Sequence, residues 1–355
     1  MTPRPRIPTR VALLAAALAA ALPVGARADT VAEELVKYHQ PVDEAIDQAL
    51  EYLASQQQRD GSFRSKMRRN TGIASLCLMA FLAKGHTPGT APYGDIINQG
   101  IDFVLDSQHH SGMLVANPRS HGPMYSHAIS TLMLSEVTGM VDPERQRRID
   151  AALGKALRLI LSAQKINKSR RHQGGWRYQH TSRDSDISCT GWALMSLRSA
   201  RNSGAAVPRT AIEDAVRFVL NCRNRDGGFG YQPGGGSGLA RTGTALLCLE
   251  LCGMHRDKVT LAAGDWILDH RPRGHRDNFF YYGIYYSSQG MFQLGEEHWE
   301  KFGAHMYELL LKLQRDDGSW PEPGGHEGKA GRSYATAMAV LAMSVAYRQL
   351  PIYQR

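Results

Sequence analysis

The chain has 355 residues with 43% hydrophobic residues, which is enough to bury a large core in one domain or two, and its formal net charge is +9 at pH 7. This mildly basic balance comes without a zinc-finger spacing, an RNA-binding signature or a long basic tract, so nucleic acid is excluded as the expected partner. The five cysteines are an odd number without the close spacings of a disulfide scaffold, which excludes a small disulfide-rich fold.

The chain begins with a segment typical of a secretory signal peptide. Three arginines within the first ten residues precede the apolar run VALLAAALAAALPVG, and Ala-Arg-Ala at residues 26–28 fits a cleavage site. The apolar run is too short for an ordinary membrane span, and no later segment reaches about 18 uninterrupted apolar residues. We therefore predict a signal peptide over residues 1–28, export to the periplasm or the medium, and no integral membrane segment after cleavage. The alternative is an N-terminal anchor that is not cleaved.

The remaining residues 29–355 are predicted to form a single domain. Residues 1–28 carry four arginines and no acid, so their removal lowers the formal charge from +9 to +5. Cys77, Cys189, Cys248 and Cys252 fall inside apolar helical patterns, and free cysteine packs as a small hydrophobe. We therefore expect buried, reduced thiols even in an exported protein.

Along this domain, amphipathic helices alternate with helices that are apolar nearly all round. Apolar residues recur at i, i+4, i+7 and i+8 from Val42, from Ile97 and from Ile212. After each such helix come a turn, a polar or glycine-rich loop and a second helix without a polar face. A helix of that second kind must be buried on every side. The second helices read TGIASLCLMAFLA, AISTLMLSEV, CTGWALMSL, TGTALLCLEL and TAMAVLAMSV.

The turns share a glycine followed by an aromatic or large apolar residue. Their glycines are separated by 51, 63, 53 and 90 residues, and the stretch HRPRGHRDNFFYYGIYYSSQGMF supplies the turn and second helix missing from the last gap. Six helical hairpins result, and a repeat of this size indicates a solenoid or a ring. Because the second helices are almost wholly apolar, we predict the ring, an all-α α/α toroid (α6/α6 barrel). The glycines are Gly61, Gly112, Gly175, Gly228 and Gly318.

The repeated residues have a structural explanation. The glycine allows the left-handed backbone that ends the first helix, and the following ring packs between neighbouring hairpins. A glutamine before the turn is expected to satisfy orphaned backbone groups at a neighbouring helix end. The rings are those of Phe63, Trp176, Phe229 and Trp320. The glutamines are Gln57 or Gln58, Gln108 and Gln314.

Two of the turns carry a resemblance to known families. Gln-x-x-Asp-Gly-Ser-Trp at residues 314–320 resembles the glutamine-tryptophan repeat of squalene and oxidosqualene cyclases, and RNRDGGFGYQPG at residues 223–234 resembles the repeat of protein prenyltransferase β subunits. Over the whole mature chain, blocks such as QGGWRYQ, FYYGIYYSSQGMFQLGEEHWEKF and YRQLPIY are similar to exported bacterial members of this superfamily without a settled activity. The resemblance implies an α/α toroid with a central cavity.

The acid motif of the class II cyclases is only partly present. Those enzymes protonate an isoprene double bond with an Asp-x-Asp-Asp segment, where a buried carboxylic acid shares its site with another acid. In DSDISCTGWAL, Asp184 and Asp186 match the first two acids, but Ile187 stands in place of the third. A register shifted by one leaves Asp186 alone. Asp186 is therefore the candidate catalytic acid, and the alternative is that it caps the following helix.

The zinc site of the protein prenyltransferases is broken. Those enzymes bind zinc through an aspartate, a cysteine and a histidine. Asp277 resembles the aspartate, whereas Phe279 and Ala335 stand where the cysteine and the histidine would be. The adjacent histidines at 109–110 lie in a turn without a carboxylate or cysteine at ligand spacing. We therefore expect no metal, no other cofactor and no zinc-dependent prenylation of thiols.

The N-terminal ends of the inner helices are predicted to surround one mouth of the cavity with tyrosines and a few charges. Aromatic faces attract cations and pack apolar ligands, and arginine binds carboxylate, sulfate or phosphate. We predict an isoprenoid-like, lipid or peptide ligand there, and the alternative is that the tyrosines fill the axis and bond to one another. The predicted ligand residues are Tyr125, His127, Asp184, Arg241, Tyr281, Tyr282, Tyr285, Tyr286, Arg332 and Tyr334.

Three functions remain open on the sequence. The first is an exported toroid that binds its ligand without changing it, which the broken catalytic motifs favour. The second is an enzyme related to terpene cyclases or prenyltransferases that uses Asp186 as acid. The third is a non-catalytic assembly protein, for which unusually apolar outer faces would be expected, and the first helix from Val42 lacks them.

Overall fold

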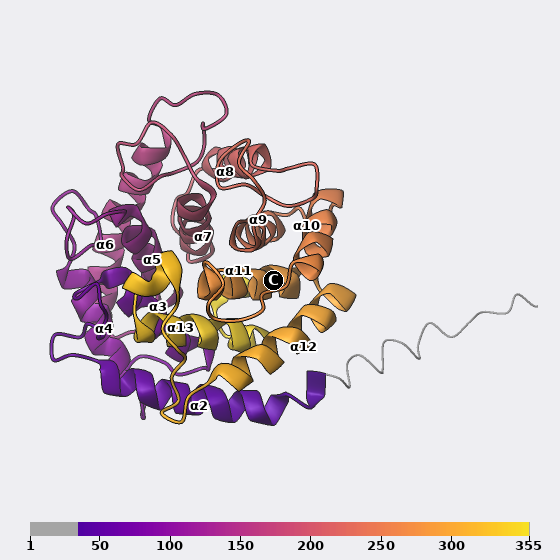
Figure 1. The fold of residues 1–355 in the computed structure, drawn as a ribbon. Coiled ribbons are helices and arrows are strands. Elements are labelled where there is room, and N and C mark those ends of the chain that lie inside the picture. Colours follow the sequence, from indigo (N-terminus) through magenta and orange to yellow (C-terminus); the bar gives the residue numbers. More distant parts are fainter. Residues whose placement is uncertain (1–34, 355) are drawn as a thin grey trace, which may run out of the picture.

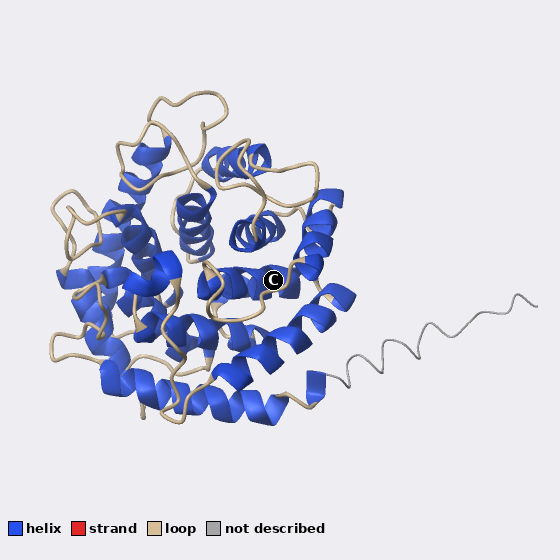
Figure 2. Cartoon of the chain, viewed as in Figure 1, coloured by secondary structure: helices blue, strands red, loops and turns tan. Residues whose placement is uncertain are grey.

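The computed structural model describes residues 35–354, and its regular structure consists of helices without a strand in that range (Figure 2). The predicted signal peptide lies outside the described residues. Among the residues described, six helices form an outer layer and six an inner layer. The outer helices are α2 (His39–Gln56), α4 (Gly94–Asp106), α6 (Pro143–Gln164), α8 (Arg209–Asn221), α10 (Lys258–Asp269) and α12 (Glu296–Leu313); the inner helices are α3 (Thr71–Ala83), α5 (Pro123–Glu136), α7 (Ile187–Asn202), α9 (Leu239–Leu251), α11 (Phe280–Leu294) and α13 (Arg332–Met343).

The two layers close into a ring (Figure 1). Each inner helix packs against the next one along the chain, and α13, the last, packs against α3, the first. In the outer layer α12 likewise contacts α2. The predicted α/α toroid is therefore confirmed, and the open solenoid is excluded because the two ends of the repeat array meet.

Burial explains why the inner helices lack a polar face. Every residue of α3 is buried, because α3 is enclosed by its inner neighbours and by the outer layer. Small residues allow the close approach of inner helices: a Cβ at Gly191 would lie 2.3 Å from Cγ2 of Thr244, and one at Gly243 would lie 2.6 Å from Oγ of Ser287. The β-prone stretch NFFYYGIYY enters helix α11, as the repeat predicts, because burial in the ring overrides local propensity.

The turn glycines pack against the next outer helix. Gly61, with φ +82°, faces the carbonyl oxygen of Gln99, from which a Cβ would be 2.2 Å away. In the third and fourth hairpins the left-handed residues are Gly174 and Gly227, not the predicted Gly175 and Gly228. The second glycine of each pair is needed for a different reason, since a Cβ at Gly175 would lie 2.6 Å from the ring of Phe218.

The glutamines bond successive hairpins together. In four turns the side-chain amide donates both to the carbonyl of the left-handed glycine of its own turn and to a carbonyl of the next outer helix. These acceptors lie within the helix, so the expected role at orphaned helix ends is wrong in that detail. The bond from Gln314 to the carbonyl of Ala45, at 2.7 Å, joins the last hairpin to the first. The four glutamines are Gln57, Gln108, Gln164 and Gln314.

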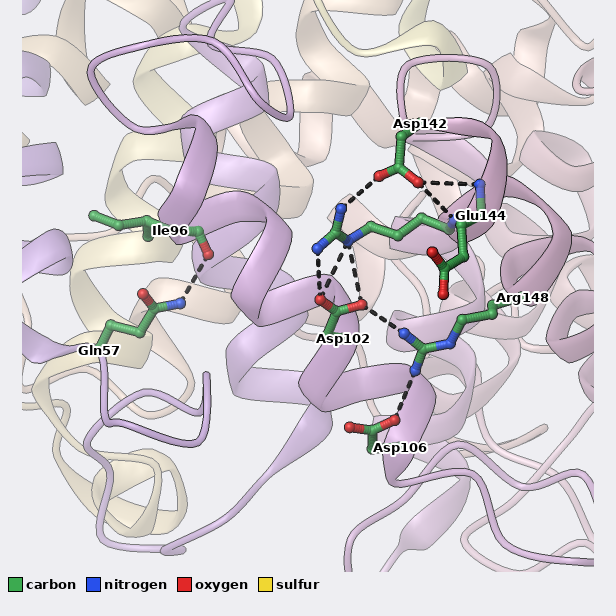
Figure 3. A network of polar contacts seen from close by, with 8 residues as sticks. Gln57, Ile96, Asp102, Asp106, Asp142, Glu144 and Arg148 are labelled. Atoms are coloured by element: carbon green, nitrogen blue, oxygen red, sulfur yellow. Dashed lines mark hydrogen bonds and ion pairs between the residues drawn. The ribbon is translucent and has the colours of Figure 1, made fainter.

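Ion pairs between outer helices also connect successive hairpins. Figure 3 shows the Gln57 amide directed at the Ile96 carbonyl and, on α4, Asp102 directed toward α6. Asp102 lies 2.8 Å from Nη2 of Arg145 and, through its other oxygen, 2.8 Å from Nη1 of Arg148. These pairs are partly exposed, so each is expected to contribute at most about 1 kcal/mol.

The cysteines are reduced and most of them are buried, as expected from their apolar helical surroundings. Cys77, Cys189, Cys222 and Cys248 are buried, Cys252 is half-buried, and all are free. Within residues 35–354, no helix is both long and apolar enough to span a bilayer.

Candidate functional site

Half-buried tyrosines gather at the end of the ring where the inner helices begin. The Tyr125 ring on α5 lies 5.7 Å from the ring of Tyr178, which comes from the loop before α7. The hydroxyl of Tyr178 contacts that of Tyr231, from the loop before α9. Tyr282 on α11 completes the group, and its hydroxyl accepts a hydrogen bond from Thr244 at 3.1 Å. We call these four tyrosines the rim.

The guanidinium of Arg177 lies among the rim tyrosines. Its central carbon is 4.7 Å from the ring centre of Tyr178 and 5.3 Å from that of Tyr231, within the range of cation–π attraction. Nε lies 3.5 Å from Asp184 and 3.8 Å from Asp186, so the guanidinium is also held by two carboxylates. Its buried Nη1 has no hydrogen-bond partner in the described part of the chain.

Asp186 caps helix α7 through one oxygen, and its other oxygen, Oδ2, lies 3.8 Å from Nε of Arg177. Oδ1 accepts the N–H of Cys189 at 2.9 Å, as the capping alternative predicted. The side chain is fully buried, and Oδ2 has no hydrogen-bond partner within residues 35–354. Burial raises the pKa of Asp186 to about 6, while the Cys189 N–H and the charge of Arg177 act in the opposite direction. A buried carboxyl with a raised pKa and one oxygen without a hydrogen bond can donate or accept a proton near neutrality.

A second buried carboxyl lies at the same mouth. Glu327 belongs to the 3₁₀ turn η1 (Gly325–Lys329), and its Oε1 accepts the N–H of Tyr282 at 2.9 Å and the hydroxyl of Tyr334 at 2.7 Å. Burial raises the pKa of Glu327, and both tyrosine contacts lower it. The other oxygen, Oε2, has no partner among the residues described. Glu327 thus contacts Tyr282 directly, and Asp186 acts on the same tyrosine electrostatically.

Of the three charged side chains predicted at the mouth, one lies there and two do not. Asp184 is partly exposed and accepts a hydrogen bond from Gln232 at 3.2 Å beside Arg177, so it lies at the rim. Arg241 instead donates to the carbonyl of Gly236 at 2.8 Å in its own loop. Arg332 pairs with Asp317 of the preceding turn at 3.1 Å. The arginine that enters the site is thus Arg177, and the two predicted arginines hold loops.

His127 has a structural role. Its Nδ1 accepts the backbone N–H of Leu114 at 3.1 Å. The hydroxyls of Thr190, Thr242 and Thr336 accept the corresponding N–H in three other hairpins. His127 is fully buried and substitutes for a threonine in this repeated contact. Its Nε2 is buried without a hydrogen-bond partner in the described residues, and the expectation that it lines a ligand cavity stays a prediction.

The axis of the ring is filled by side chains. Tyr281, Tyr285 and Tyr286 have at most 1% of their surface exposed, so solvent has no access to them. Tyr285 stacks on Trp192 with ring centres 5.6 Å apart, and Tyr286 meets the same indole edge-on at 5.1 Å. Tyr281 points away and donates to the carbonyl of Pro321 at 2.7 Å. These three tyrosines pack the axis, as the alternative predicted, but of the three Tyr285 alone bonds to another tyrosine in the described part of the chain, Tyr353.

The sequence contained a signal for the residues that were missed. Tyr178 and Tyr231 each stand two positions after the buried ring of a turn, in WRYQ and FGYQ. These two turns therefore send a tyrosine toward the mouth, whereas the remaining turns carry no tyrosine at that position. Arg177, between ring and tyrosine, is placed by the same geometry, and Glu327 shows no comparable pattern.

The histidines give no sign of a metal site. The rings of His109 and His110 lie 3.8 Å apart, and Nδ1 of His109 contacts the hydroxyl of Ser111. Within residues 35–354, no three histidine, cysteine or carboxylate side chains gather in a way that could hold a metal ion.

Comparison with known proteins agrees with this architecture. The family model described as the prenyltransferase alpha-alpha toroid domain matches residues 33–153 and 98–276 of this chain, more than half of its length. The chain belongs to this family. No curated protein matches it in sequence.

Solved structures resemble this chain at low sequence identity. An inactive variant of an α-1,6-mannanase from Salegentibacter sp. HEL1_6, in complex with α-1,6-mannotriose, is 9% identical, with 86% of this chain and 98% of that chain covered and a TM-score of 0.63. A protein from Actinoplanes is 14% identical, with 86% and 99% covered and a TM-score of 0.56. A type II terpene cyclase from Scytonema is 15% identical, with 89% and 100% covered and a TM-score of 0.42. At these identities the likeness extends to the fold alone.

Proposed function

We propose that this protein is an exported toroid that binds an amphipathic ligand across the rim, without changing it chemically. One observation carries the proposal: Oδ2 of Asp186 and Nη1 of Arg177 are buried without hydrogen-bond partners directly beneath the tyrosines of the rim. A buried polar atom left unpaired costs roughly 1–3 kcal/mol. Because Asp186 is fully buried, a ligand has to displace the rim side chains that cover it; one that then supplies both a donor and an acceptor recovers that free energy on binding.

The rim supports a particular ligand chemistry. The faces of Tyr125 and Tyr178 suit a flat or apolar portion of the ligand. Arg177 suits an acceptor such as a carbonyl, hydroxyl or phosphate oxygen, and Asp186 suits a donor. An isoprenoid head group, a peptide segment and a sugar ring share this chemistry. Because side chains fill the axis, the ligand would lie across the mouth, and an isoprenoid tail would not be enclosed in the ring.

Binding measurements with the full-length mature protein test the proposal. Isothermal titration calorimetry would compare a polyprenyl diphosphate, a tyrosine-free peptide library and α-1,6-mannotriose. For the ligand that binds, Asp186→Asn and Arg177→Gln should each weaken affinity by about tenfold or more, since each removes a charged hydrogen-bonding group. Arg332→Gln is the matched control, because Arg332 pairs with Asp317 outside the rim. Equal affinity in all three variants would refute a site at the rim.

An acid catalyst is the second candidate, favoured by the raised pKa of two buried carboxyls at one mouth. Asp186, with a pKa of about 6, would donate the proton to an isoprene double bond or to a leaving oxygen. Incubation with squalene, polyprenyl diphosphates and α-mannan oligosaccharides, followed by product analysis, tests this reading. Turnover that Asp186→Asn abolishes would replace the binding proposal with an enzymatic one.

Export is tested separately. Expression of the full chain in a bacterial host, followed by cell fractionation and N-terminal sequencing, should recover a mature protein that begins near Asp29. A protein that remains with the membrane fraction and keeps Met1 would instead indicate a retained anchor.

A further inference from the structure

The other end of the axis is closed by the last residues of the chain. After α13 the chain forms two 3₁₀ turns, η2 (Ser344–Tyr347) and η3 (Pro351–Tyr353), and Figure 1 shows the C-terminus inside the ring beside α11. Leu350, Ile352 and Tyr353 are almost fully buried there. We call residues 348–354 the plug. It lies at the C-terminal ends of the inner helices, opposite the rim, because its contacts are to the last turns of α5 and α11.

Buried side chains of the ring hold the plug by its backbone. Oε2 of Glu136, the last residue of α5, accepts the N–H of Ile352 at 3.0 Å. Nε2 of Gln293, near the end of α11, donates to the carbonyl of Tyr353 at 3.1 Å. Backbone groups are common to every peptide, so these two contacts select a main chain in the 3₁₀ turn of η3 and not a particular set of side chains.

One pocket adds selectivity for a tyrosine. The hydroxyl of Tyr353 lies 2.5 Å from that of Tyr285, whose ring stacks on Trp192. Glu136 is fixed at the same place by the hydroxyl of Ser199, which donates to its Oε1. The pocket is thus preformed by three inner helices, and the plug contributes only the tyrosine and the neighbouring aliphatic residue.

The plug fits this site incompletely. A small, partly open pocket of about 10 Å³, room for about one water molecule, remains between the plug and the ring beside Gln289, Leu341 and Leu350. Oε1 of Gln289 is buried there without a hydrogen-bond partner in the described residues. The plug begins at Arg348, which has a left-handed backbone (φ 53°), a conformation that costs a non-glycine residue roughly 1–2 kcal/mol. Both features reduce the free energy that retains the plug.

From these contacts we infer that the plug end of the axis is a peptide-binding site, occupied by the protein's own C-terminus, and that a peptide carrying an aliphatic residue followed by tyrosine displaces the plug. The partner is identified by that chemistry: two backbone groups for Glu136 and Gln293, and a phenol for the pocket at Tyr285. The inference does not depend on the proposed function, because the rim lies at the opposite end of the inner helices.

The test uses full-length protein and a fluorescent peptide of sequence RQLPIYQR, which corresponds to residues 348–355. Tyr353→Ala weakens the internal occupant and leaves the site intact, so it should bind the peptide about tenfold more tightly than the wild type, as expected for one lost buried hydrogen bond. A peptide with alanine in place of its tyrosine should not bind. Gln293→Ala, combined with Tyr353→Ala, should abolish binding. Arg332→Gln, combined with Tyr353→Ala, is the matched control and should bind normally, because Arg332 pairs with Asp317 away from both the rim and the plug.

Two further measurements keep the inference falsifiable if Tyr353→Ala unfolds. Tyr353→Phe keeps the ring and removes only the hydroxyl contact, so it should also bind the peptide more tightly than the wild type. Hydrogen exchange of the wild type should show the Ile352 amide opening more readily than the amides of α11. Folded Tyr353 variants that bind no peptide, or an Ile352 amide that exchanges only through global unfolding, would overturn the inference. Failure of ligand binding at the rim would leave these results unchanged.

Discussion

Glu136 makes the stability of the ring depend on pH in a defined way. This carboxyl is 1% exposed and receives the hydroxyl of Ser199 and the N–H of Ile352. Burial raises its pKa from 4.5 to about 7, because water no longer solvates the charged form. The titratable groups that face it are Tyr285 and Tyr353, both neutral over this range. Replacing Glu136 by Gln removes the titration and keeps a side chain of nearly the same shape.

The direction of the effect follows from proton linkage. Between pH 4.5 and about 7 the folded protein holds a proton on Glu136 that the unfolded chain has released. The stabilisation that this proton represents is fully present below pH 4.5 and is lost as the pH rises to about 7. One pKa unit corresponds to about 1.4 kcal/mol, so the loss amounts to about 3 kcal/mol in the free energy of unfolding.

Urea unfolding monitored by tryptophan fluorescence at several pH values measures this difference. Asp186 and His127 titrate in the same range, with pKa values of about 6 and about 4. The informative quantity is therefore the difference in the free energy of unfolding between the variant and the wild type at each pH. Glu136→Gln should gain about 3 kcal/mol relative to the wild type between pH 4.5 and 8. Parallel stability curves for the two proteins would show that Glu136 is not buried in the way described, and the reasoning would fail.

The other predictions concern the repeat. Gly174→Ala places a Cβ 2.2 Å from the carbonyl of Asp214, so it should destabilise the fold by clearly more than the roughly 1–2 kcal/mol of a left-handed alanine. Gly204→Ala, also left-handed but with open space around it, should cost only that amount, and equal losses in chemical denaturation would contradict the contact. Gln314→Ala should lower stability by about 1–3 kcal/mol, because two carbonyls lose their donor at the closure of the ring; an unchanged melting temperature would speak against it. Cys248 should resist a thiol reagent until the protein unfolds, since burial raises its pKa well above the ordinary value; labelling of the native protein at the rate of a free thiol would disprove this.

The repeat could be predicted because its residues act locally. The almost wholly apolar α3 and the turn glycine Gly61 each have one physical explanation within their own hairpin, namely burial and left-handed backbone. The sequence of a hairpin by itself could not show which of two adjacent turn glycines is left-handed. Gly174 differs from Gly175 only in what each touches, the Asp214 carbonyl in one case and the Phe218 ring in the other.

In the candidate site too, local features could be predicted from the sequence, whereas contacts between hairpins could not. Asp186 was identified from its partial match to the Asp-x-Asp-Asp motif of the class II cyclases, and its N-cap bond, the alternative, depends only on local geometry. Arg177 was missed because its importance depends on Tyr178 and Tyr231, which come from two separate hairpins. Tyr285 was expected to line open space, yet Trp192 and Tyr353 fill that space from other parts of the chain.

The sequence alone determined the layers of this protein and their order, because a helix that is apolar on every side has to lie inside, and a repeat of such helices has to stack. Only the tertiary structure decided what the ring encloses. Whether an axis is hollow depends on the summed volume of side chains from all six inner helices and on where the chain's last residues pack. Neither the summed volume nor the position of the last residues can be inferred from the periodicity of a single segment.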